Sequence, residues 1–330
     1  MADKQEITLD KVRSTLSALG TGWDANTVPD LLALYEPLQA AQNTKYVDSV
    51  TVTRTKYGSH DRHRANIYRP STTSSSSESL PVVVYIHGGA YVGGDTDVTD
   101  NVYANVGNYF ASRGHVCVVI TYRLAFQGAH YPDGAEDVAS ALRWVRDNIA
   151  QHGGDSARVA ALGQSAGGSH LSSALFLGLL DGEDGDGAKA PLIRGAVLLG
   201  AAFQSYPDGE MYPILKEYFQ TGDKAELATR CGPGALFRQE YFFGSSGAKK
   251  PRGELPCEVL VMWSEWDFGE IVDGTVEWCE DYRRRFRRLP ILETMKGHNH
   301  VSYCFGLGLE GEEYEKVGRR LVEFVGEVTR

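Results

Sequence analysis

Apolar residues near the start of the chain repeat at helical spacing. One stripe at residues 9–19 recurs every three or four positions and stops at Gly20, and a second stripe occupies residues 28–38. This spacing places the apolar side chains on one face of each segment. The pattern therefore predicts two amphipathic helices ahead of the first strand.

After residue 80 the pattern changes to short runs that are almost entirely apolar. Five such runs occupy residues 82–86, 116–120, 158–162, 193–199 and 259–262. Between them, residues 133–148 repeat at helical spacing. Apolar strands that alternate with helices predict an α/β fold, with a mostly parallel sheet covered on both faces. Ligands of such sheets bind at the carboxyl ends of the strands, so motifs there carry the most weight.

Two segments depart from this alternation. Residues 71–79 are rich in serine and predict a surface loop. Residues 203–250 are rich in aromatic residues and too long for a simple connection between two core strands. We therefore expect residues 1–45 to form helices that contribute to a cap, residues 46–330 to form an α/β domain, and about 203–250 to be a cap insertion.

Composition limits the kinds of molecule that this chain is expected to bind. The chain has 330 residues, with 33 basic and 43 acidic side chains and a net charge of −10, which disfavours a nucleic acid partner. It has no apolar run of membrane-spanning length and opens on polar residues, so we expect a cytoplasmic protein without a membrane partner. The five cysteines have no metal-ligand spacing, so no metal site is expected.

The first chemical motif is Gly163-Gln164-Ser165-Ala166-Gly167, which follows an apolar run directly. Small residues on both sides of a serine allow a sharp turn from strand to helix, and this turn raises the hydroxyl above the sheet. The position of the motif therefore predicts that Ser165 is a nucleophile.

The second motif, His87-Gly88-Gly89-Ala90-Tyr91, follows the run at residues 82–86. Acyl transfer places negative charge on the former carbonyl oxygen, and a glycine-rich loop lets backbone N–H groups converge on that charge. We expect an oxyanion hole here, with His87 as a brace for the loop rather than a base.

A serine nucleophile needs a base and a group that orients the base. Asp267 follows the strand predicted at residues 259–262, and His298 and His300 follow another apolar run. This gives the chain order Ser, Asp, His of the α/β-hydrolases. Spacing alone leaves both histidines open, and it leaves three rival acids: Glu265, Glu270 and Asp273.

Several motifs together identify a resemblance. The stretches His87-Gly88-Gly89-Ala90, Tyr122-Arg123-Leu124-Ala125, Glu136-Asp137-Val138 and residues 163–168 resemble the hormone-sensitive-lipase-like branch of the α/β-hydrolases. The segments around Asp267 and residues 297–302 resemble the kynurenine formamidase relatives. In those relatives the second histidine of such a segment is catalytic, which favours His300.

The resemblance implies serine-dependent acyl transfer without a metal or an organic cofactor. Carried over, Ser165 is the nucleophile, His300 the general base and then acid, and Asp267 the orienting carboxylate. The implied oxyanion hole comprises Gly88, which shapes the turn, and the N–H groups of Gly89, Ala90 and Ala166. Tyr91, Gln164 and Phe203 are expected to contact substrate. Tyr91 and Gln164 differ from the residues usual in formamidases, which disfavours that reaction.

The expected partner is a small acyl compound. An apolar roof would suit a medium acyl chain, so the first hypothesis is an ester or thioester hydrolase that releases a polyketide as an acid or lactone, as similar fungal thiohydrolases do. A short-acyl carboxylesterase, an arylformamidase and a non-catalytic binding protein are the alternatives, and His300 disfavours the last. The arginines at 283–285 and 287–288 are either a solvated helix face or a docking patch for an acyl carrier protein.

Overall fold

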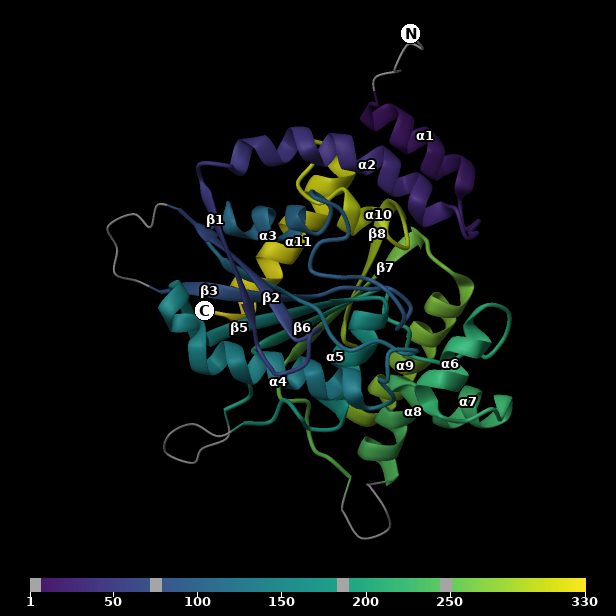
Figure 1. Cartoon of the computed structure of the whole chain (residues 1–330). Helices are drawn as coiled ribbons and strands as arrows, with labels where there is room; N and C mark the ends of the chain where they lie inside the picture. The colour runs from purple at the N-terminus through teal and green to yellow at the C-terminus, as the bar shows by residue number, and fades with distance from the viewer. Residues whose placement is uncertain (1–6, 72–78, 183–189, 244–250) are drawn as a thin grey trace.

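The chain is built around a mixed sheet that is mostly parallel (Figure 1). The structure, a computed structural model, describes residues 7–71, 79–182, 190–243 and 251–330, so most of the predicted serine-rich loop lies outside the described residues. The strands are β1 (Val50–Lys56), β2 (Arg64–Pro70), β3 (Leu80–Ile86), β4 (Val116–Ile120), β5 (Gly154–Gln164), β6 (Gly195–Leu199), β7 (Glu258–Trp266) and β8 (Ile291–Asn299). Their order is β1-β2-β4-β3-β5-β6-β7-β8, and β2 alone among them runs antiparallel to its neighbours.

Both faces of the sheet are buried because successive side chains of a strand point to opposite sides. In β3, Val82, Val84 and Ile86 join one apolar core, whereas Val83 and Tyr85 join the other. The first core is covered by α4 (Asp133–Asn148), α5 (Ala166–Phe176), α8 (Pro233–Arg238) and α9 (Gly269–Phe286). The second is covered by α3 (Ala104–Ala111), α10 (Ser302–Phe305), α11 (Glu312–Val328) and the N-terminal helices. The predicted α/β class is confirmed.

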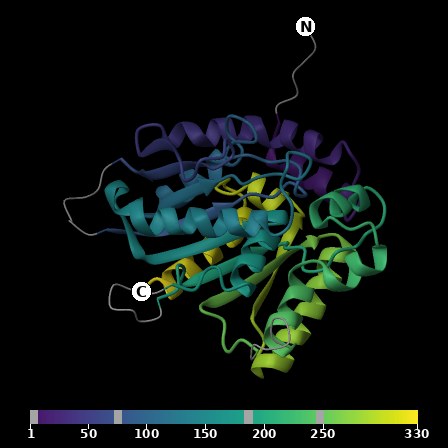
Figure 2. The same cartoon turned by 60° about the horizontal axis from the view of Figure 1, so that its bottom comes forward.

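The two predicted N-terminal helices are α1 (Leu9–Leu19) and α2 (Thr27–Asn43), which extend over the α3 and α11 side of the molecule (Figures 1 and 2). Val12 and Leu16 of α1 and Leu31 and Tyr35 of α2 are fully buried. Each such side chain contributes about 1.5–3 kcal/mol through burial, so the helices are held by their apolar stripes.

Polar contacts fix these helices to the segment that follows β8. The hydroxyl groups of Tyr35 and Tyr314 are 2.6 Å apart, and the Gln39 amide donates to the carbonyl oxygen of Phe305 at 2.7 Å. Arg13 of α1 donates to the carboxylate of Glu313 at 2.8 Å. The N-terminal cover therefore depends on a segment 266 to 300 residues away in the chain.

The insertion between β6 and β7 divides into two parts. α6 (Met211–Phe219) and α7 (Lys224–Arg230) pack through Tyr218 and Leu227 into a small apolar cluster that includes Tyr91 and Ala166. α8 and η3 (Gln239–Phe243) instead belong to the first core, where the ring of Phe237 stacks on Tyr241 at 4.7 Å. The first part thus covers the loop at Tyr91, and the second part completes the core; residues 244–250 lie outside the described chain.

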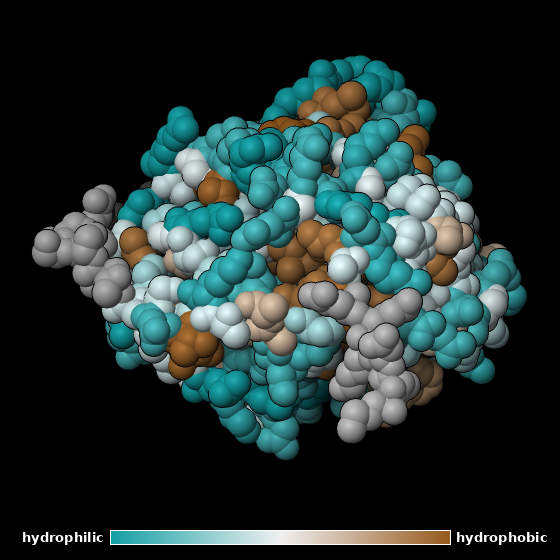
Figure 3. Space-filling model, turned by 90° about the horizontal axis from the view of Figure 1, so that it is seen from above, coloured by the Kyte–Doolittle hydropathy of each residue, from teal (hydrophilic) through white to brown (hydrophobic). Residues whose placement is uncertain are grey.

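The face of the molecule seen from above is mainly hydrophilic. Seen from above, hydrophobic residues form separate groups among polar ones (Figure 3). Among the residues that the structure describes, none of the helices combines the length and the apolar character needed to cross a membrane.

Candidate active site

Ser165 occupies the sharp turn between β5 and α5. Its backbone angles are φ 52° and ψ −121°, a region that residues with a side chain rarely adopt. The Ser165 N–H donates to the carbonyl oxygen of Leu199 on the neighbouring strand at 2.8 Å, which helps to hold this turn. A Cβ atom on Gly167 would lie 2.3 Å from the carbonyl oxygens of Ile86 and His87, so glycine is required there. The motif therefore has the strand–turn–helix context that the sequence predicts.

Two loops at the ends of neighbouring strands bring the other chemical groups to Ser165. Asp267 directly follows β7, and His300 directly follows β8. His300 Nε2 is 2.8 Å from Ser165 Oγ, and His300 Nδ1 is 2.7 Å from Asp267 Oδ1. Only 6% of His300 and 3% of Asp267 is exposed, so the hydrogen bond between these two residues is shielded from water.

The Asp267 carboxylate has donors on both oxygens. Besides His300, it accepts hydrogen bonds from the Ser264 N–H and hydroxyl at 3.0 and 2.9 Å and from the Phe268 N–H at 3.0 Å. Burial by itself would raise the pKa of Asp267, but His300 and these donors outweigh burial and lower the pKa. The charged carboxylate favours a proton on His300 Nδ1, so Nε2 is free to accept the Ser165 proton.

The alternative histidine and acids lie elsewhere. His298 is buried, with Nδ1 3.1 Å from the Ser302 hydroxyl and Nε2 3.3 Å from the Glu313 carbonyl oxygen. Burial lowers the pKa of His298 to about 4. The Glu265 carboxylate accepts the Gly297 N–H at 2.8 Å. Glu270 and Asp273 are the remaining rivals, and both are exposed. The structure thus joins His300 and Asp267 to Ser165.

The glycine-rich loop after β3 lies directly against the serine. A Cβ on Gly88 would be 3.1 Å from the Cβ of Ser165. The carbonyl oxygen of Gly89 accepts the N–H groups of Val92 and Gly93, both at 2.9 Å, which closes the loop. Within the described ranges, the N–H groups of Gly89 and Ala90 have no hydrogen-bond partner and can donate to a substrate oxygen. Ala166 is the first residue of α5, where backbone N–H groups lack helical acceptors.

Gly88 differs from the other residues predicted for the oxyanion hole. Its N–H donates to Gln164 Oε1 at 3.3 Å, so this group is already engaged. The role expected for Gly88, to shape the turn rather than to donate to the oxyanion, agrees with this engaged N–H.

His87 braces the same loop. Its Nδ1 lies 2.6 Å from the Gly88 carbonyl oxygen, its Nε2 lies 3.1 Å from the Thr121 hydroxyl, and its ring stacks on Tyr122 at 4.5 Å. Burial lowers the pKa of His87 to about 4, so the ring is neutral at pH 7. These contacts agree with a structural role.

The predicted substrate contact through Gln164 is wrong. Its side chain is 1% exposed, and Oε1 accepts the hydroxyl groups of Tyr85 and Tyr103 at 2.9 and 2.8 Å in addition to the Gly88 N–H. Gln164 therefore fixes the glycine-rich loop to the core from below.

Packing also accounts for the other two residues predicted to contact substrate. Phe203 is fully buried and stacks on Trp278 at 4.5 Å, so the prediction for Phe203 is wrong. Tyr91 stacks on Tyr218 of α6 at 4.7 Å and is nearly buried. The Tyr91 ring thus supports the cap helix rather than facing an open space.

Two aromatic residues beside His300 were missed by the sequence analysis. The ring of Phe268 lies 4.7 Å from the imidazole, and the ring of Trp23 lies 4.8 Å from Phe268 and 6.1 Å from the imidazole. Phe268 adjoins Asp267 in sequence, which is a local signal. Trp23 belongs to the α1–α2 connection, and only the packing of the N-terminal cover brings it here.

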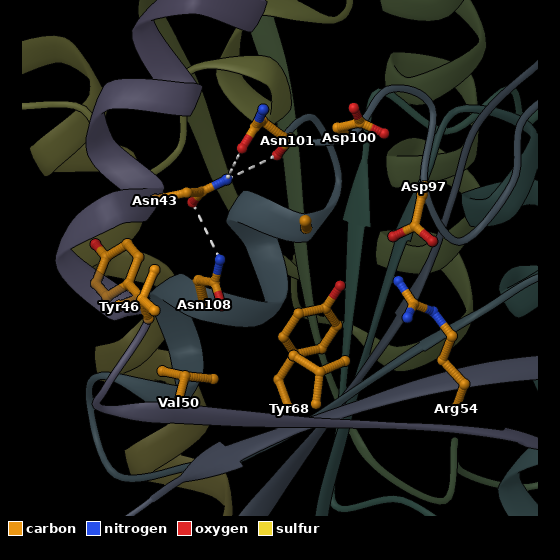
Figure 4. A pocket seen from close by; sticks show the side chains of 12 residues that line it. Asn43, Tyr46, Val50, Arg54, Tyr68, Asp97, Asp100, Asn101 and Asn108 are labelled. Carbon is orange, nitrogen blue, oxygen red and sulfur yellow. Dashed lines mark hydrogen bonds between the residues drawn. The ribbon is translucent and has the colours of Figure 1, made fainter.

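A cavity of about 430 Å³ lies away from this site, between α2, α3, β1 and β2 (Figure 4). Tyr68 and Val50 rise from its floor, and Arg54 extends toward Asp97 at one side. None of Ser165, Asp267 and His300 lines this cavity. In the part of the chain that the structure describes, no group of three or more histidine, cysteine, aspartate or glutamate side chains could hold a metal ion.

Comparison with solved structures decides the fold. A thermostable esterase from Pseudomonas putida aligns with 100% of this chain and 99% of its own, with a TM-score of 0.68 and 17% identity. Brefeldin A esterase, a bacterial homologue of human hormone-sensitive lipase, aligns with 96% of this chain and 93% of its own, with a TM-score of 0.67 and 19% identity. The chain has the α/β-hydrolase fold. The predicted α/β-hydrolase fold is thus confirmed.

Each sequence match covers less than half of this chain. Residues 65–190 match the family described as BD-FAE. An acylcarnitine hydrolase of Mus musculus is 40% identical over 129 residues, which are 36% of this chain and 22% of the relative. Carboxylesterase NlhH of Mycobacterium tuberculosis (strain H37Rv) is 42% identical over 98 residues, or 28% of each chain. The chain thus spans less than a third of the length of these relatives.

Proposed function

We propose that this α/β-hydrolase is a serine esterase that cleaves carboxylic esters through an acyl-enzyme. The observation that carries the proposal is the continuous hydrogen-bonded chain from Asp267 through His300 to Ser165. A strained serine backbone, a buried carboxylate and a correctly oriented imidazole are the elements that activate a hydroxyl group.

In the first half-reaction, Ser165 Oγ bonds to the ester carbonyl carbon while His300 Nε2 takes the hydroxyl proton. The resulting oxyanion accepts hydrogen bonds from the N–H groups of Gly89, Ala90 and Ala166. The bond between carbon and alcohol oxygen then breaks, and His300 returns the proton to the departing alcohol. In the second half-reaction water adds with the same proton transfers, and the products are a carboxylic acid and free Ser165.

The oxyanion donors should account for much of the rate. Removing one such donor typically costs about 3 kcal/mol, or 100- to 1,000-fold in rate, because no water is positioned to replace it. The fixed glycine-rich loop, braced by His87 and Gln164, supports this role: its donors are oriented before substrate arrives.

The names of the relatives favour an ester over the other acyl compounds. Carboxylesterase NlhH and the aligned Pseudomonas putida esterase are both named as esterases. A general carboxylesterase is therefore preferred to a polyketide-releasing thiohydrolase or an arylformamidase. The same groups could also attack a thioester. The assay described below therefore compares an ester with a thioester and identifies whether the product is an acid or a lactone.

A docking patch for an acyl carrier protein also remains a prediction. Arg283 and Arg284 both pair with Glu280, at 2.7 and 3.0 Å, and Arg288 lies 3.4 Å from Glu258. These pairs offset part of the positive charge on this end of α9, which favours the solvated-face interpretation.

The test compares purified wild type and Ser165→Ala on an ethyl ester, the matching hydroxyacyl thioester and an N-formyl aryl amine, with products identified by mass. We expect the ester to be cleaved to the free acid and the rate to fall by about a million-fold in Ser165→Ala. A loss of less than tenfold would contradict the mechanism. Faster turnover of the thioester or the formamide would move the chain to one of the other substrate classes.

A further inference from the structure

The α1–α2 connection brings an aromatic side chain to the catalytic histidine. Trp23 lies edge-on to Phe268, with ring centroids 4.8 Å apart, and edge-on to His300 at 6.1 Å. Phe268 itself lies 4.7 Å from His300. Two aromatic rings from distant parts of the sequence therefore lie together near one imidazole.

Trp23 is held in place on both sides. Before it, Gly20 ends α1 with φ 53°, and the Gly22 N–H donates to the Leu19 carbonyl oxygen at 2.7 Å. After it, the Asp24 carboxylate accepts the N–H groups of Asn26 and Thr27 at 2.8 and 3.0 Å, at the start of α2. Both helices are anchored to the segment after β8, so the connection is fixed relative to His300.

Trp23 keeps part of its side chain open to solvent. It is 37% exposed, whereas Tyr91 and Phe203 are buried in packing. Exposed tryptophan surface is unfavourable in water and becomes favourable when an apolar group covers it. The open face therefore fits contact with a substrate.

Chemistry determines which part of the substrate reaches this position. A general acid must lie within hydrogen-bond distance of the atom it protonates, so the ester's alcohol oxygen approaches His300 Nε2. The substituent on that oxygen must then pass beside the rings next to His300. The acyl chain is bonded to the carbonyl carbon at Ser165 and leaves that carbon in another direction.

We propose that Trp23 and Phe268 form the binding surface for the alcohol part of the ester, and that Trp23 makes this enzyme selective for esters of aromatic or bulky apolar alcohols. This inference rests on the proposed esterase function. It assigns Trp23 to substrate selection, and it assigns the acyl chain to a different surface.

The test uses butyrate esters that share one acyl group and differ in alcohol: ethyl, cyclohexylmethyl and benzyl. We expect wild type to prefer benzyl to ethyl butyrate in kcat/KM, and Trp23→Ala to lose about tenfold of that preference because one aromatic contact is removed. Trp23→Phe should restore most of it. Phe243→Ala removes another exposed aromatic side chain and should leave the preference unchanged.

The rate of deacylation shows whether Trp23 contacts the alcohol or only supports the structure of the site. All three esters form the same butyryl-enzyme, so its hydrolysis, measured in single turnover, carries no information about the alcohol. We expect Trp23→Ala to change this rate less than threefold. Equal losses for all three esters, together with slower deacylation, would overturn the proposal and make Trp23 a support for His300.

A third outcome concerns the esterase function itself. If wild type cleaves none of the butyrates faster than Ser165→Ala does, the proposed function fails. If wild type is active but prefers benzyl to ethyl butyrate no more than Trp23→Ala does, the esterase assignment stands and the role of Trp23 is refuted.

Discussion

The loops that carry the reacting groups and the helices that cover them are held in different ways. Ser165, Asp267 and His300 each follow a strand directly, so the sheet fixes their spacing, and backbone or side-chain hydrogen bonds fix their orientation. The N-terminal cover has no strand in the sheet. It is attached through buried side chains such as Leu16 and Tyr35 and through contacts with the segment after β8.

This difference assigns the reaction itself to the strand ends and the choice of substrate to the N-terminal cover. The strand ends form a rigid, closely packed arrangement in which small changes should abolish the reaction. The cover contributes Trp23 at the edge of the same site, where changes should alter which substrates react. Each prediction below tests one side of this division.

Among the tests of this division, the largest effect is expected on the orienting acid. Asp267→Asn should lower kcat by about 10,000-fold, because the amide can no longer hold the reactive tautomer and charge of His300. Glu265→Gln is the matched control, since Glu265 is a rival acid in sequence but, among the residues that the structure describes, contacts Gly297 and Lys296. Equal losses in the two variants, measured on one ester, would mean that Asp267 does not orient the base.

Lowering the pH should destabilise the folded chain through three buried histidines near the strand ends. Burial lowers the pKa of His87 and His298 to about 4 and of His170 to about 3. Between pH 6.5 and 4 the unfolded chain binds protons that the folded chain excludes, so stability falls as pH falls. Each histidine contributes up to about 1.4 kcal/mol per pH unit in this window.

Urea unfolding at pH 7, 6 and 5 measures this effect. The midpoint should decrease at each step, and His298→Gln should show a shallower dependence on pH than wild type. A midpoint that stays constant from pH 7 to 5 would show that these histidines are not held neutral in the fold.

A smaller effect distinguishes two glycines in helices. Gly167→Ala should cost about 1–3 kcal/mol of stability, because the new Cβ would meet the carbonyl oxygens of Ile86 and His87 at 2.3 Å. In α11, Gly326 has nothing within 4 Å of an added Cβ, so Gly326→Ala should stabilise by up to about 1 kcal/mol. Chemical denaturation of both variants checks the signs, and a neutral Gly167→Ala would refute the close packing at the nucleophile turn.

The smallest effect concerns the cover. Arg13→Gln removes an ion pair with Glu313 that is partly exposed on the Arg13 side, so stability should fall by less than about 1 kcal/mol. Turnover of ethyl butyrate should stay within twofold of wild type. A loss of tenfold or more would mean that the position of α1 controls the chemistry itself, against the proposed division.

The sequence predicted the site better than its surroundings. The strands at residues 82–86 and 116–120 and both N-terminal helices form as expected, because their periodicity is local. The motif around Ser165 and the chain order of Asp267 and His300 also translate directly into geometry. In these cases a short segment contains the information that places each residue.

The errors arise where burial depends on distant segments. Nothing in the sequence near Gln164 shows that Tyr85 and Tyr103 will donate to it, or that Trp278 will stack on Phe203. The contact of Trp23 with His300 likewise joins residues 277 positions apart, and this contact exists only after α1 and α2 have packed.

The central claim is that Ser165 is the nucleophile activated by His300, and covalent trapping tests it most directly. An activated alkyl phosphonate ester should add once per chain, on the peptide that contains Ser165. The adduct should be absent in Ser165→Ala and should form far more slowly in His300→Ala. Labelling of another residue, or equal labelling of wild type and Ser165→Ala, would contradict the account.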